Sequence, residues 1–499
     1  MPSAQPLPKA RFRRAAPGRF IWPALFLLIA VLTGFSLPAS GSVPTFYAGS
    51  GEFGYQDGSR LEADFRFPYG LTANKDNQII VADSHNNRIR KIAGDQVTTV
   101  AGFSDSFDAF GFPAGGYVDG AAEKARFRNP RGIVVDSANT IYVADTGNHA
   151  IRKISGGRVS TFAGNGRPGY QDGTGNQARF NAPSGLAIDE HDNLYVSDTL
   201  NNVIRKITPQ GLVSTLAGQA GPNGGYRDGP VGGARFNEPA GLALAGNGAL
   251  YVLDSGNQLV RKIQDLQVST LAGFRDLREE ETDYAPGAYR DGAWAEARFN
   301  FPKGIDLAPN GVIFIADTWN HRVRALTPQG EAITIAGTGR AGRTAETSTS
   351  MLNGPVDLLY HDGVLYISDM WNNGLRALPL DPYNLPRLLT PAPAAERIRV
   401  WLDGELLPFP DAEPYIEQGR VILPLRALGE KLGGQVQWLP HEHKAIVKKG
   451  ALEQAFAAPY LTIRENRSMI PLRYLAERMG FQVEWVEQER AVFLKSRDQ

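Results

Sequence analysis

Residues 127–154 read FRNPRGIVVDSANTIYVADTGNHAIRKI, and five other segments of the chain repeat this pattern. Each copy carries a Phe, a Pro-x-Gly, a β-rich run that ends in Asp, an Asn-containing turn and a run around Arg. The Asp of the six copies is Asp83, Asp145, Asp198, Asp254, Asp317 and Asp369. The sixth copy is degenerate, because Leu352 replaces the Phe and Asp357 replaces the Gly. Self-similarity of this kind predicts a repeat architecture in which each copy is one supersecondary unit.

A second signature, Thr-x-Ala-Gly, follows each of the first five copies and is missing after the sixth. A related segment, Phe46–Gly49, instead stands before the first copy. We therefore expect a strand from the N-terminus to complete the last unit. That arrangement closes the repeats into a ring and leaves no sheet edge open.

Each unit contains about four short β-rich runs separated by turn residues, as expected for a propeller blade. The copies resemble the NHL repeat, named for an Asn-His-Leu segment, to which Asn148-His149 and Asn320-His321 stand closest. The resemblance covers residues 44–378 and implies a six-bladed β-propeller. The expected fold class is therefore mainly β, with a propeller of NHL repeats closed by an N-terminal strand and a small C-terminal α+β domain.

Two residues that recur in the copies have an expected structural role. The repeated Asp ends one strand, and its short acidic side chain can cap backbone N–H groups of the turn that follows. The Asn in that turn tolerates unusual backbone angles. We therefore expect both residues to serve the fold rather than to bind a metal or to act in catalysis.

The insertions between the repeats carry the candidate binding residues. Five of them contain Tyr-x-Asp-Gly, and most run on into Ala-Arg-Phe. We expect these side chains to form a ring around the central channel on one face of the disc, since Tyr and Arg often anchor recognition surfaces. The set is Tyr55, Asp57, Tyr117, Asp119, Arg126, Tyr170, Asp172, Arg179, Tyr226, Asp228, Arg235, Tyr289, Asp291 and Arg298. The alternative, favoured by the repetition, is that an Asp–Arg pair seals the gap between blades.

Histidines in the repeat turns suggest a different function. Some propellers of this type are lyases that hold a metal on histidines of the channel, and His85, His149 and His321 stand at repeat turns. These side chains would converge only if the turns folded inward. The sequence contains no nucleophile elbow, phosphate-binding Gly loop or His-Glu-x-x-His. We therefore expect no catalytic residues, no metal and no cofactor, with a metal-dependent lyase or hydrolase as the alternative.

The N-terminus has the pattern of an export segment. Four Arg residues precede an apolar run over residues 20–37, and small residues follow it. We interpret residues 1–41 as a signal peptide or an N-terminal membrane anchor. The Arg cluster would stay inside the cell and place the rest of the chain outside. The expected localisation is extracellular or at the cell surface, with membrane contact only through this segment.

Composition narrows the range of partners. The chain has 52 Lys and Arg against 52 Asp and Glu, so its net charge is zero and nucleic acid is not an expected partner. It has no Cys, which excludes disulfides and thiol chemistry.

A Pro-rich linker over residues 379–396 leads to a second domain at residues 397–499. This domain contains two Pro-Leu-Arg segments, at residues 424–426 and 471–473, and each is expected to begin a short helix. The pair resembles the small N-terminal domain of copper amine oxidases. The resemblance implies neither copper nor amine oxidation, because the copper and quinone of that family belong to a separate catalytic domain.

These features together predict an exported binding or scaffold protein of the cell envelope. One face of the propeller would recognise an extracellular protein, a peptide or a cell-wall polysaccharide. Loops on a rigid scaffold tend to carry function, so the non-repeated stretches 103–115, 276–287 and 339–350 are candidates for specificity.

Overall fold

A computed structural model describes residues 43–109, 111–274, 284–344 and 350–381 of the propeller region and, with short gaps, residues 398–496. The predicted export segment and most of the predicted linker lie outside the described residues. None of the helices in the described part is long and apolar enough to span a bilayer.

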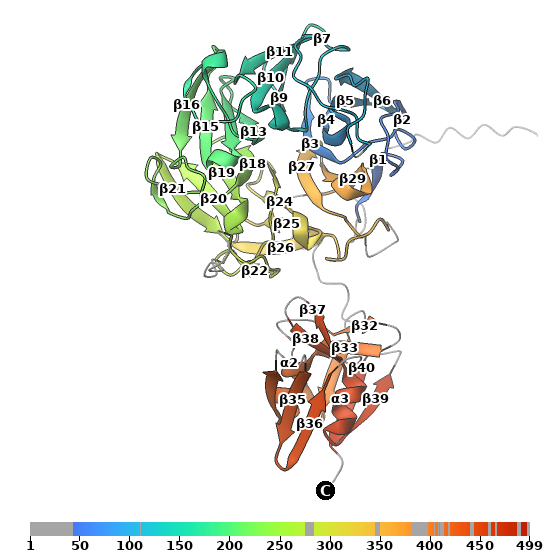
Figure 1. Ribbon diagram of the computed structural model, residues 1–499. Coiled ribbons are helices and arrows are strands. Elements are labelled where there is room, and N and C mark those ends of the chain that lie inside the picture. Colours follow the sequence, from blue (N-terminus) through green and yellow to red (C-terminus); the bar gives the residue numbers. More distant parts are fainter. Residues whose placement is uncertain are drawn as a thin grey trace, which may run out of the picture. The chain divides into compact units, whose positions relative to one another are not determined.

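Six antiparallel sheets follow one another along residues 43–381 and stand around a common centre (Figure 1). The innermost strand of each sheet begins at or next to the Pro-x-Gly of the repeat. These strands are β3 (Pro68–Ala73), β8 (Pro130–Val135), β13 (Pro183–Ile188), β18 (Pro239–Leu244), β23 (Gly304–Leu307) and β27 (Pro355–His361). Each contacts the innermost strand of the next blade, and β27 also contacts β3.

The second and third strands of each blade flank a one-turn 3₁₀ helix that begins directly after the repeated Asp. The second strands are β4 (Ile79–Asp83), β9 (Ile141–Asp145), β14 (Leu194–Asp198), β19 (Leu250–Asp254), β24 (Ile313–Asp317) and β28 (Val364–Asp369). The 3₁₀ helices are η1 (Ser84–Asn86), η2 (Thr146–Asn148), η4 (Thr199–Asn201), η5 (Ser255–Asn257), η6 (Thr318–Asn320) and η7 (Met370–Asn372). The third strands are β5 (Arg88–Ala93), β10 (Ala150–Ser155), β15 (Val203–Ile207), β20 (Leu259–Gln264), β25 (Arg322–Leu326) and β29 (Gly374–Pro379).

The fourth strand of the first five blades carries the Thr-x-Ala of the second signature. These strands are β6 (Gln96–Ala101), β11 (Arg158–Ala163), β16 (Leu212–Ala217), β21 (Gln267–Ala272) and β26 (Glu331–Ala336). In the sixth blade β1 (Thr45–Ala48) takes this place and pairs antiparallel with β29, with Thr45 opposite Ala377 and Phe46 opposite Arg376. The start of the chain thus supplies the outer strand of the last sheet.

Five blades have one strand more than the sequence predicted. The end of each Tyr-x-Asp-Gly insertion forms a two-residue strand that pairs with the fourth strand at the outer edge of the same blade. These strands are β2 (Gly58–Ser59), β7 (Gly120–Ala121), β12 (Gly173–Thr174), β17 (Gly229–Pro230) and β22 (Gly292–Ala293); η3 (Gly175–Gln177) follows β12. Each of the five insertions therefore crosses the outer edge of the blade that follows it.

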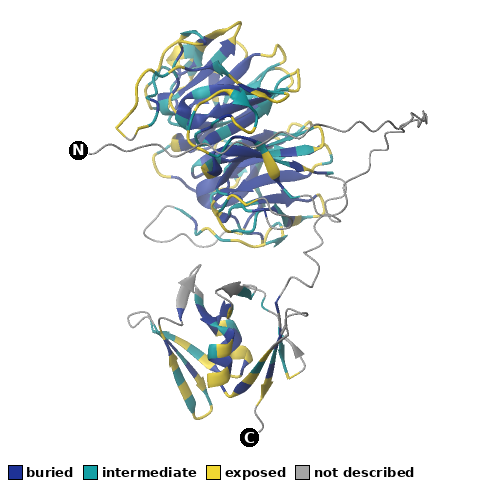
Figure 2. Cartoon of the chain, turned by 90° about the vertical axis from the view of Figure 1, so that its right-hand side faces the viewer, coloured by how far each residue is buried: buried dark blue, intermediate teal, exposed yellow. Residues whose placement is uncertain are grey.

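The apolar core lies between successive blades, where the repeated Phe is buried (Figure 2). Phe127, for example, packs against Ile80 and Ile89 of the first blade and against Ile133 and Val143 of its own. Burial of an aromatic side chain of this size contributes on the order of 2–3 kcal/mol. The repeated Phe of the first five copies, and Leu352 in the sixth, therefore pack in the core between blades.

The second domain holds short strands around two helices. The strands are β30 (Arg399–Leu402), β31 (Glu405–Leu406), β32 (Tyr415–Glu417), β33 (Arg420–Pro424), β34 (Gln435–Leu439), β35 (Lys444–Lys449), β36 (Leu452–Phe456), β37 (Thr462–Arg464), β38 (Arg467–Pro471), β39 (Phe481–Val486) and β40 (Ala491–Ser496). As the two Pro-Leu-Arg segments predicted, α2 (Leu425–Lys431) and α3 (Leu472–Arg478) begin directly after Pro424 and Pro471. Leu428 and Leu475 of these helices are buried in one core.

Candidate recognition face

A buried Arg lies at the centre of each blade and connects its inner and outer parts. In the third blade, Nη1 of Arg205 donates to Asp198 at 2.7 Å and Nη2 donates to Asp172 at 2.6 Å. Its side chain has no exposed surface. The same double pairing joins Arg90 to Asp83 and Asp57, Arg152 to Asp145 and Asp119, Arg261 to Asp254 and Asp228, and Arg324 to Asp317 and Asp291.

The repeated Asp holds loops together rather than capping the turn that follows it. Oδ1 of Asp198 accepts the backbone N–H of Asn181, which lies just ahead of the inner strand, at 2.7 Å. Oδ2 accepts a hydrogen bond from Nδ2 of Asn201 at 2.8 Å, and no side-chain cap forms on the 3₁₀ helix. The prediction of a fold role holds, although the bonded groups differ from those expected.

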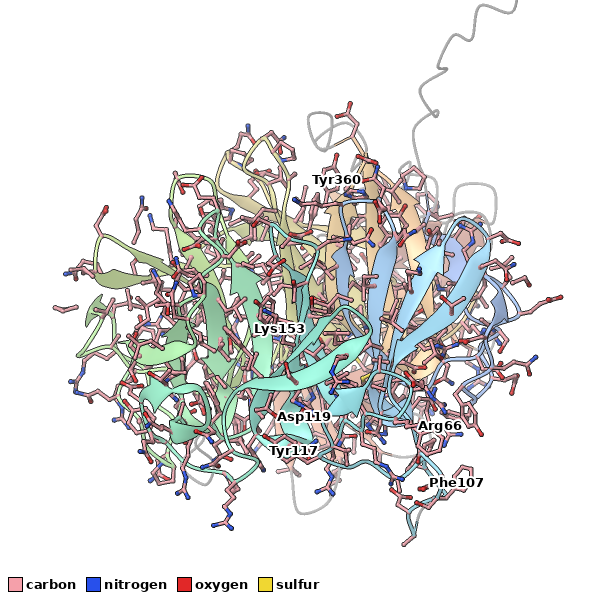
Figure 3. All side chains as sticks on the ribbon, turned by 90° about the horizontal axis from the view of Figure 1, so that it is seen from above. Arg66, Phe107, Tyr117, Asp119, Lys153 and Tyr360 are labelled. Atoms are coloured by element: carbon pink, nitrogen blue, oxygen red, sulfur yellow. The ribbon has the colours of Figure 1, made fainter. Side chains whose placement is uncertain are left out.

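The Tyr-x-Asp insertions lie beside the outer strands and not around the channel. Oδ2 of Asp172 accepts the backbone N–H of Thr215 on the fourth strand at 3.1 Å, and the hydroxyl of Tyr170 lies 2.7 Å from that of Thr215. Tyr117 and Asp119 lie on the same side of the disc as Arg66, and Tyr360 lies on the opposite side (Figure 3). The insertions thus share one face, as the sequence predicted, but they occupy its outer margin.

The Asp–Arg pairs form inside blades and use a different Arg from the one expected. Asp57, Asp119, Asp172, Asp228 and Asp291 pair with the third-strand Arg of their own blade. The Arg of the Ala-Arg-Phe segments instead forms an isolated backbone bridge with its insertion, as Arg126, Arg179, Arg235 and Arg298 do. The side chain of Arg126 also pairs with Asp105 at 2.6 Å.

A hydrogen bond between neighbouring blades recurs six times on this face. The residue after each of these six 3₁₀ helices has a left-handed backbone. Its side chain accepts a hydrogen bond from a backbone N–H of the next blade, that of the residue directly before the Pro of the Pro-x-Gly segment or of its sixth-copy equivalent. The pairs are Asn87 with Asn129, His149 with Ala182, Asn202 with Glu238, Gln258 with Phe301, His321 with Gly354 and Asn373 with Phe67. Turn residues that looked structural are therefore connections between blades.

These bonds define the state of two of the three candidate metal-binding histidines. Nδ1 of His149 and Nδ1 of His321 accept N–H groups at 3.0 and 3.1 Å, so neither nitrogen is protonated. Burial lowers the pKa of both imidazoles, which favours this neutral form. His85 instead lies in η1 and contacts the rings of Phe67 and Phe112. The three side chains are not brought together, and the described residues include no group of three or more His, Asp or Glu that could hold a metal.

One position in the turn differs more between the blades than its neighbours do. The middle residue of the 3₁₀ helix is His85, Gly147, Leu200, Gly256, Trp319 and Trp371 in the six blades. Trp319 is 57% exposed and Trp371 is 37% exposed. Exposed indoles at the tip of a turn have no role in the blade core, so this position can differ for function.

The two Trp residues belong to a continuous aromatic patch on the fifth and sixth blades. Ring centroids are 6.4 Å apart between Trp319 and Trp371 and 5.9 Å apart between Phe301 and Trp319. Tyr284 extends the patch to Phe301 at 5.5 Å, and His321 lies 6.0 Å from Trp371. We call these five residues the aromatic patch.

Phe301 reaches the patch through a strained backbone. It has φ of 46° and precedes Pro302, and Phe67 is the corresponding residue of the first blade with φ of 49°. The residue before this Pro has a left-handed backbone in all six blades, so the conformation belongs to the repeat, although a bulky residue rarely adopts it. The N–H bond to Gln258 holds Phe301 in place.

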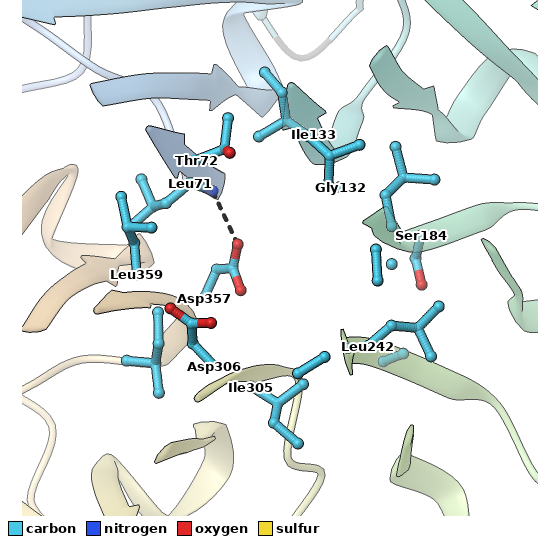
Figure 4. A pocket seen from close by; sticks show the side chains of 18 of the residues that line it. Leu71, Thr72, Gly132, Ile133, Ser184, Leu242, Ile305, Asp306, Asp357 and Leu359 are labelled. Atoms are coloured by element: carbon cyan, nitrogen blue, oxygen red, sulfur yellow. Dashed lines mark hydrogen bonds between the residues drawn. The ribbon is translucent and has the colours of Figure 1, made fainter. Parts of the chain in front are cut away.

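The central channel contains two carboxyl groups. Its cavity has a volume of about 180 Å³ and is lined by the inner strands. Asp306 and Asp357 point into this space (Figure 4). Asp357 accepts the backbone N–H of Leu71 from the first blade at 2.9 Å, and Asp306 accepts that of Tyr360 at 2.6 Å. Both carboxyls therefore join neighbouring inner strands.

Asp357 gives the protein a distinct pH dependence. Burial raises the pKa of Asp357 to about 8 from an ordinary value of 3.8, and that of Asp306 to about 6. Between pH 4 and 8 the folded state binds more protons than the unfolded chain, so stability falls as pH rises through this window. Asp357 keeps part of its surface exposed, so water screens part of this effect. We expect Asp357→Asn to raise the free energy of unfolding by about 2 kcal/mol at pH 9 and to change it little near pH 5. Denaturant unfolding at both pH values measures this; equal effects at the two would contradict it.

The sequence alone did not single out the aromatic patch or the channel carboxyls. The signal was present in the repeats, as the residue before the Asn of the Asp-x-x-Asn turn, which differs most between the copies, and as Asp357 in place of a repeated Gly. Both were visible only by asking where the copies differ. Residues 276–283 and 345–349 lie outside the described residues, and the role of the stretches 103–115, 276–287 and 339–350 in specificity stays a prediction.

Comparisons with known proteins match the two parts of the chain separately. Family models match the Teneurin NHL domain at residues 115–327, the NHL repeat at 65–92 and the copper amine oxidase N-terminal domain at 401–456 and 457–494. SUPPRESSOR OF QUENCHING 1 of Arabidopsis thaliana is 28% identical over 300 residues, which cover 55% of this chain and 27% of that protein. NHL repeat-containing protein 2 of Bos taurus is 27% identical over 352 residues, which cover 63% of this chain and 47% of that protein. The chain thus spans less than half the length of these relatives. An auxiliary nutrient binding protein from Bacteroides thetaiotaomicron aligns with a TM-score of 0.49 and 14% identity over 68% of this chain and 75% of that chain.

Proposed function

We propose that this chain, an NHL-repeat β-propeller followed by a copper amine oxidase N-terminal-type domain, is an exported binding or scaffold protein of the cell surface. Relatives that share its repeats support a binding or scaffold role for the propeller. Export rests on the pattern of residues 1–41, and sequencing the N-terminus of the mature protein would distinguish cleavage from anchoring.

The observation that carries the proposal is the aromatic patch. Five blades repeat the same buried Arg–Asp network and the sixth keeps its Arg and one Asp, yet the exposed tip of the turn is Trp in only two adjacent blades. Indoles and phenyl rings provide large contact areas at low entropic cost, and they dominate the binding energy of recognition surfaces. We therefore place the ligand over the fifth and sixth blades, on the face that carries the 3₁₀ turns.

The ligand we propose is an extended polymer of the cell exterior. A row of rings from Tyr284 to Trp371 offers successive flat, apolar surfaces with polar edges, and the hydroxyl of Tyr284 bonds Glu238 at 2.6 Å. Such a row suits stacking against the sugar rings of a wall polysaccharide or against the side chains of a polypeptide.

A binding experiment with matched variants tests the proposal. The purified protein is mixed with insoluble peptidoglycan, and separately with immobilised secreted polypeptides, and the bound fraction is measured against protein concentration. The double variant Trp319→Ala with Trp371→Ala is expected to bind the true ligand about 30-fold more weakly, the cost of losing a strong hot spot. Leu200→Ala is the control, because Leu200 occupies the same tip in the third blade. Equal binding by both variants would rule out the aromatic patch as the binding surface.

A further inference from the structure

The sixth blade lacks one of the two carboxylates that hold the central Arg in the other five. Arg376 pairs with the repeated Asp369, with Nε 2.9 Å from Oδ2. Its Nη2 donates to the backbone oxygen of Arg343 at 3.1 Å, where the other blades add a carboxylate from the insertion. Residues 339–350 contain no Asp, and their one acidic residue, Glu346, lies outside the described residues.

Arg376 holds its repeated Asp through Nε, whereas the other five blades use Nη1, and this leaves Nη1 of Arg376 without a partner. The side chain is 1% exposed, yet its Nη1 is buried and forms no hydrogen bond. Leaving a buried charged donor unpaired is costly. The other five blades avoid this cost for their Nη1 and Nη2 groups, which all donate to carboxylates or backbone oxygens.

An aromatic ring occupies the side of Arg376 where the carboxylate would lie. In the third blade Thr215 stands opposite Arg205 and donates its N–H to Asp172. In the sixth blade Phe46 stands opposite Arg376, and the ring centroid lies 3.7 Å from the guanidinium carbon. The exposed Arg343 lies 5.3 Å from the same ring. Two guanidinium groups therefore flank a single phenyl ring, and the positive charge of this place is not balanced by Asp369 alone.

We propose that this place on the sixth blade, which lacks the insertion Asp of the other five blades, binds a carboxylate or similar oxyanion supplied by a ligand. The donors are the unpartnered Nη1 of Arg376 and the guanidinium of Arg343, whose Nη2 also donates to the backbone oxygen of Ser50. Guanidinium–carboxylate pairs of this kind are among the strongest hydrogen-bonded contacts. Phe46 is 37% exposed and its ring lies against the guanidinium of Arg376, so its side chain contacts both this place and the solvent.

The oxyanion has two possible sources, and the chemistry is the same for both. It belongs to a polypeptide, as an acidic side chain or a chain terminus, or it is a small free anion. The site is separate from the aromatic patch, so it stands or falls independently of the proposed ligand of that patch.

Thermal unfolding of the full chain in different anions provides the first test. At equal ionic strength, about 100 mM acetate or phosphate in place of chloride is expected to raise Tm by about 2 °C. Arg343→Ala should abolish the shift, and Phe46→Thr, which restores the residue of the other blades, should enlarge it. Arg322→Ala is the matched control, because Arg322 stacks on Tyr289 in a blade that has both carboxylates. It should leave the shift unchanged.

A second measurement distinguishes the sources of the oxyanion. Titration calorimetry compares a short acidic peptide with its uncharged amide counterpart; tighter binding of the acidic peptide than of acetate identifies a polypeptide ligand, and equal affinity identifies a small anion. No anion-specific shift in the parent protein would overturn the proposal. So would a shift that appears only in Glu346→Ala, since Glu346 would then already fill the place.

Discussion

Replacing Arg205 by Leu is expected to lower the free energy of unfolding of the propeller by about 3–5 kcal/mol. The guanidinium is fully buried between Asp198 and Asp172, and it also donates to two backbone oxygens. Without it, one carboxylate with no exposed surface loses its countercharge, and the outer strand loses its tie to the inner loop. Denaturant unfolding followed by Trp fluorescence measures the change.

A second variant separates the effect of the two-sided hydrogen bonding of Arg205 from that of its charge, and a third is a control. Arg205→Lys keeps the positive charge but cannot bridge both carboxylates. We therefore expect it to lower the free energy of unfolding by about half as much as Arg205→Leu does. Lys206→Ala changes the next residue of β15, which is partly exposed, and should stay within about 0.5 kcal/mol of the parent protein. A loss below about 1 kcal/mol for Arg205→Leu would mean that the two Asp residues find other partners.

Gly185→Ala is expected to cost about 3 kcal/mol through a clash between inner strands. A Cβ at this position would lie 2.0 Å from the backbone oxygen of Ala240 on the next blade, and a backbone oxygen cannot swing away. The same approach recurs at Gly70 and Gly132, at 2.1 and 2.3 Å. The Gly of the Pro-x-Gly motif is therefore required by the packing of strands around the channel.

The control for this substitution is a Gly in the turn between the first two strands of the fourth blade. Gly246→Ala adds a methyl group with no neighbour within 4 Å, so its cost should be small. Asp357 stands where the other blades have this Gly, and Asp357→Gly should cost about 1 kcal/mol at pH 5 from the lost bond to Leu71. If Gly185→Ala unfolds like Gly246→Ala, the inner strands can separate more easily than their spacing suggests.

The architecture could be predicted because each copy repeats the same pattern of β-rich runs and turn residues. The displaced Phe46–Gly49 segment indicated that the first strand belongs to the last blade, and β1 does pair with β29. The Pro-Leu-Arg segments likewise marked the starts of both helices in the second domain. These predictions needed only periodicity and local propensity.

The candidate site depended on contacts that local rules do not encode. Asp172 pairs with Arg205, 33 residues along the chain, and not with the nearby Arg179. Phe301 takes a left-handed backbone before Pro302, which local preference disfavours, because a side chain of the previous blade holds its N–H. Asp357 looked like a lost Gly, whereas in the folded chain it replaces a strand contact with a hydrogen bond.

The pairing of β1 with β29 also sets a limit on how quickly the protein can fold. Thr45 and Ala377 are 332 positions apart, so the last sheet pairs strands from the two ends of the propeller region. Closing so long a loop has an entropic cost that only the finished contacts offset, and topologies of this kind fold slowly. The first strand leaves the ribosome long before its partner exists and waits as an unpaired edge, open to other chains. A propeller completed in this way is most vulnerable to aggregation during synthesis, and its final step is the meeting of the two ends of its longest loop.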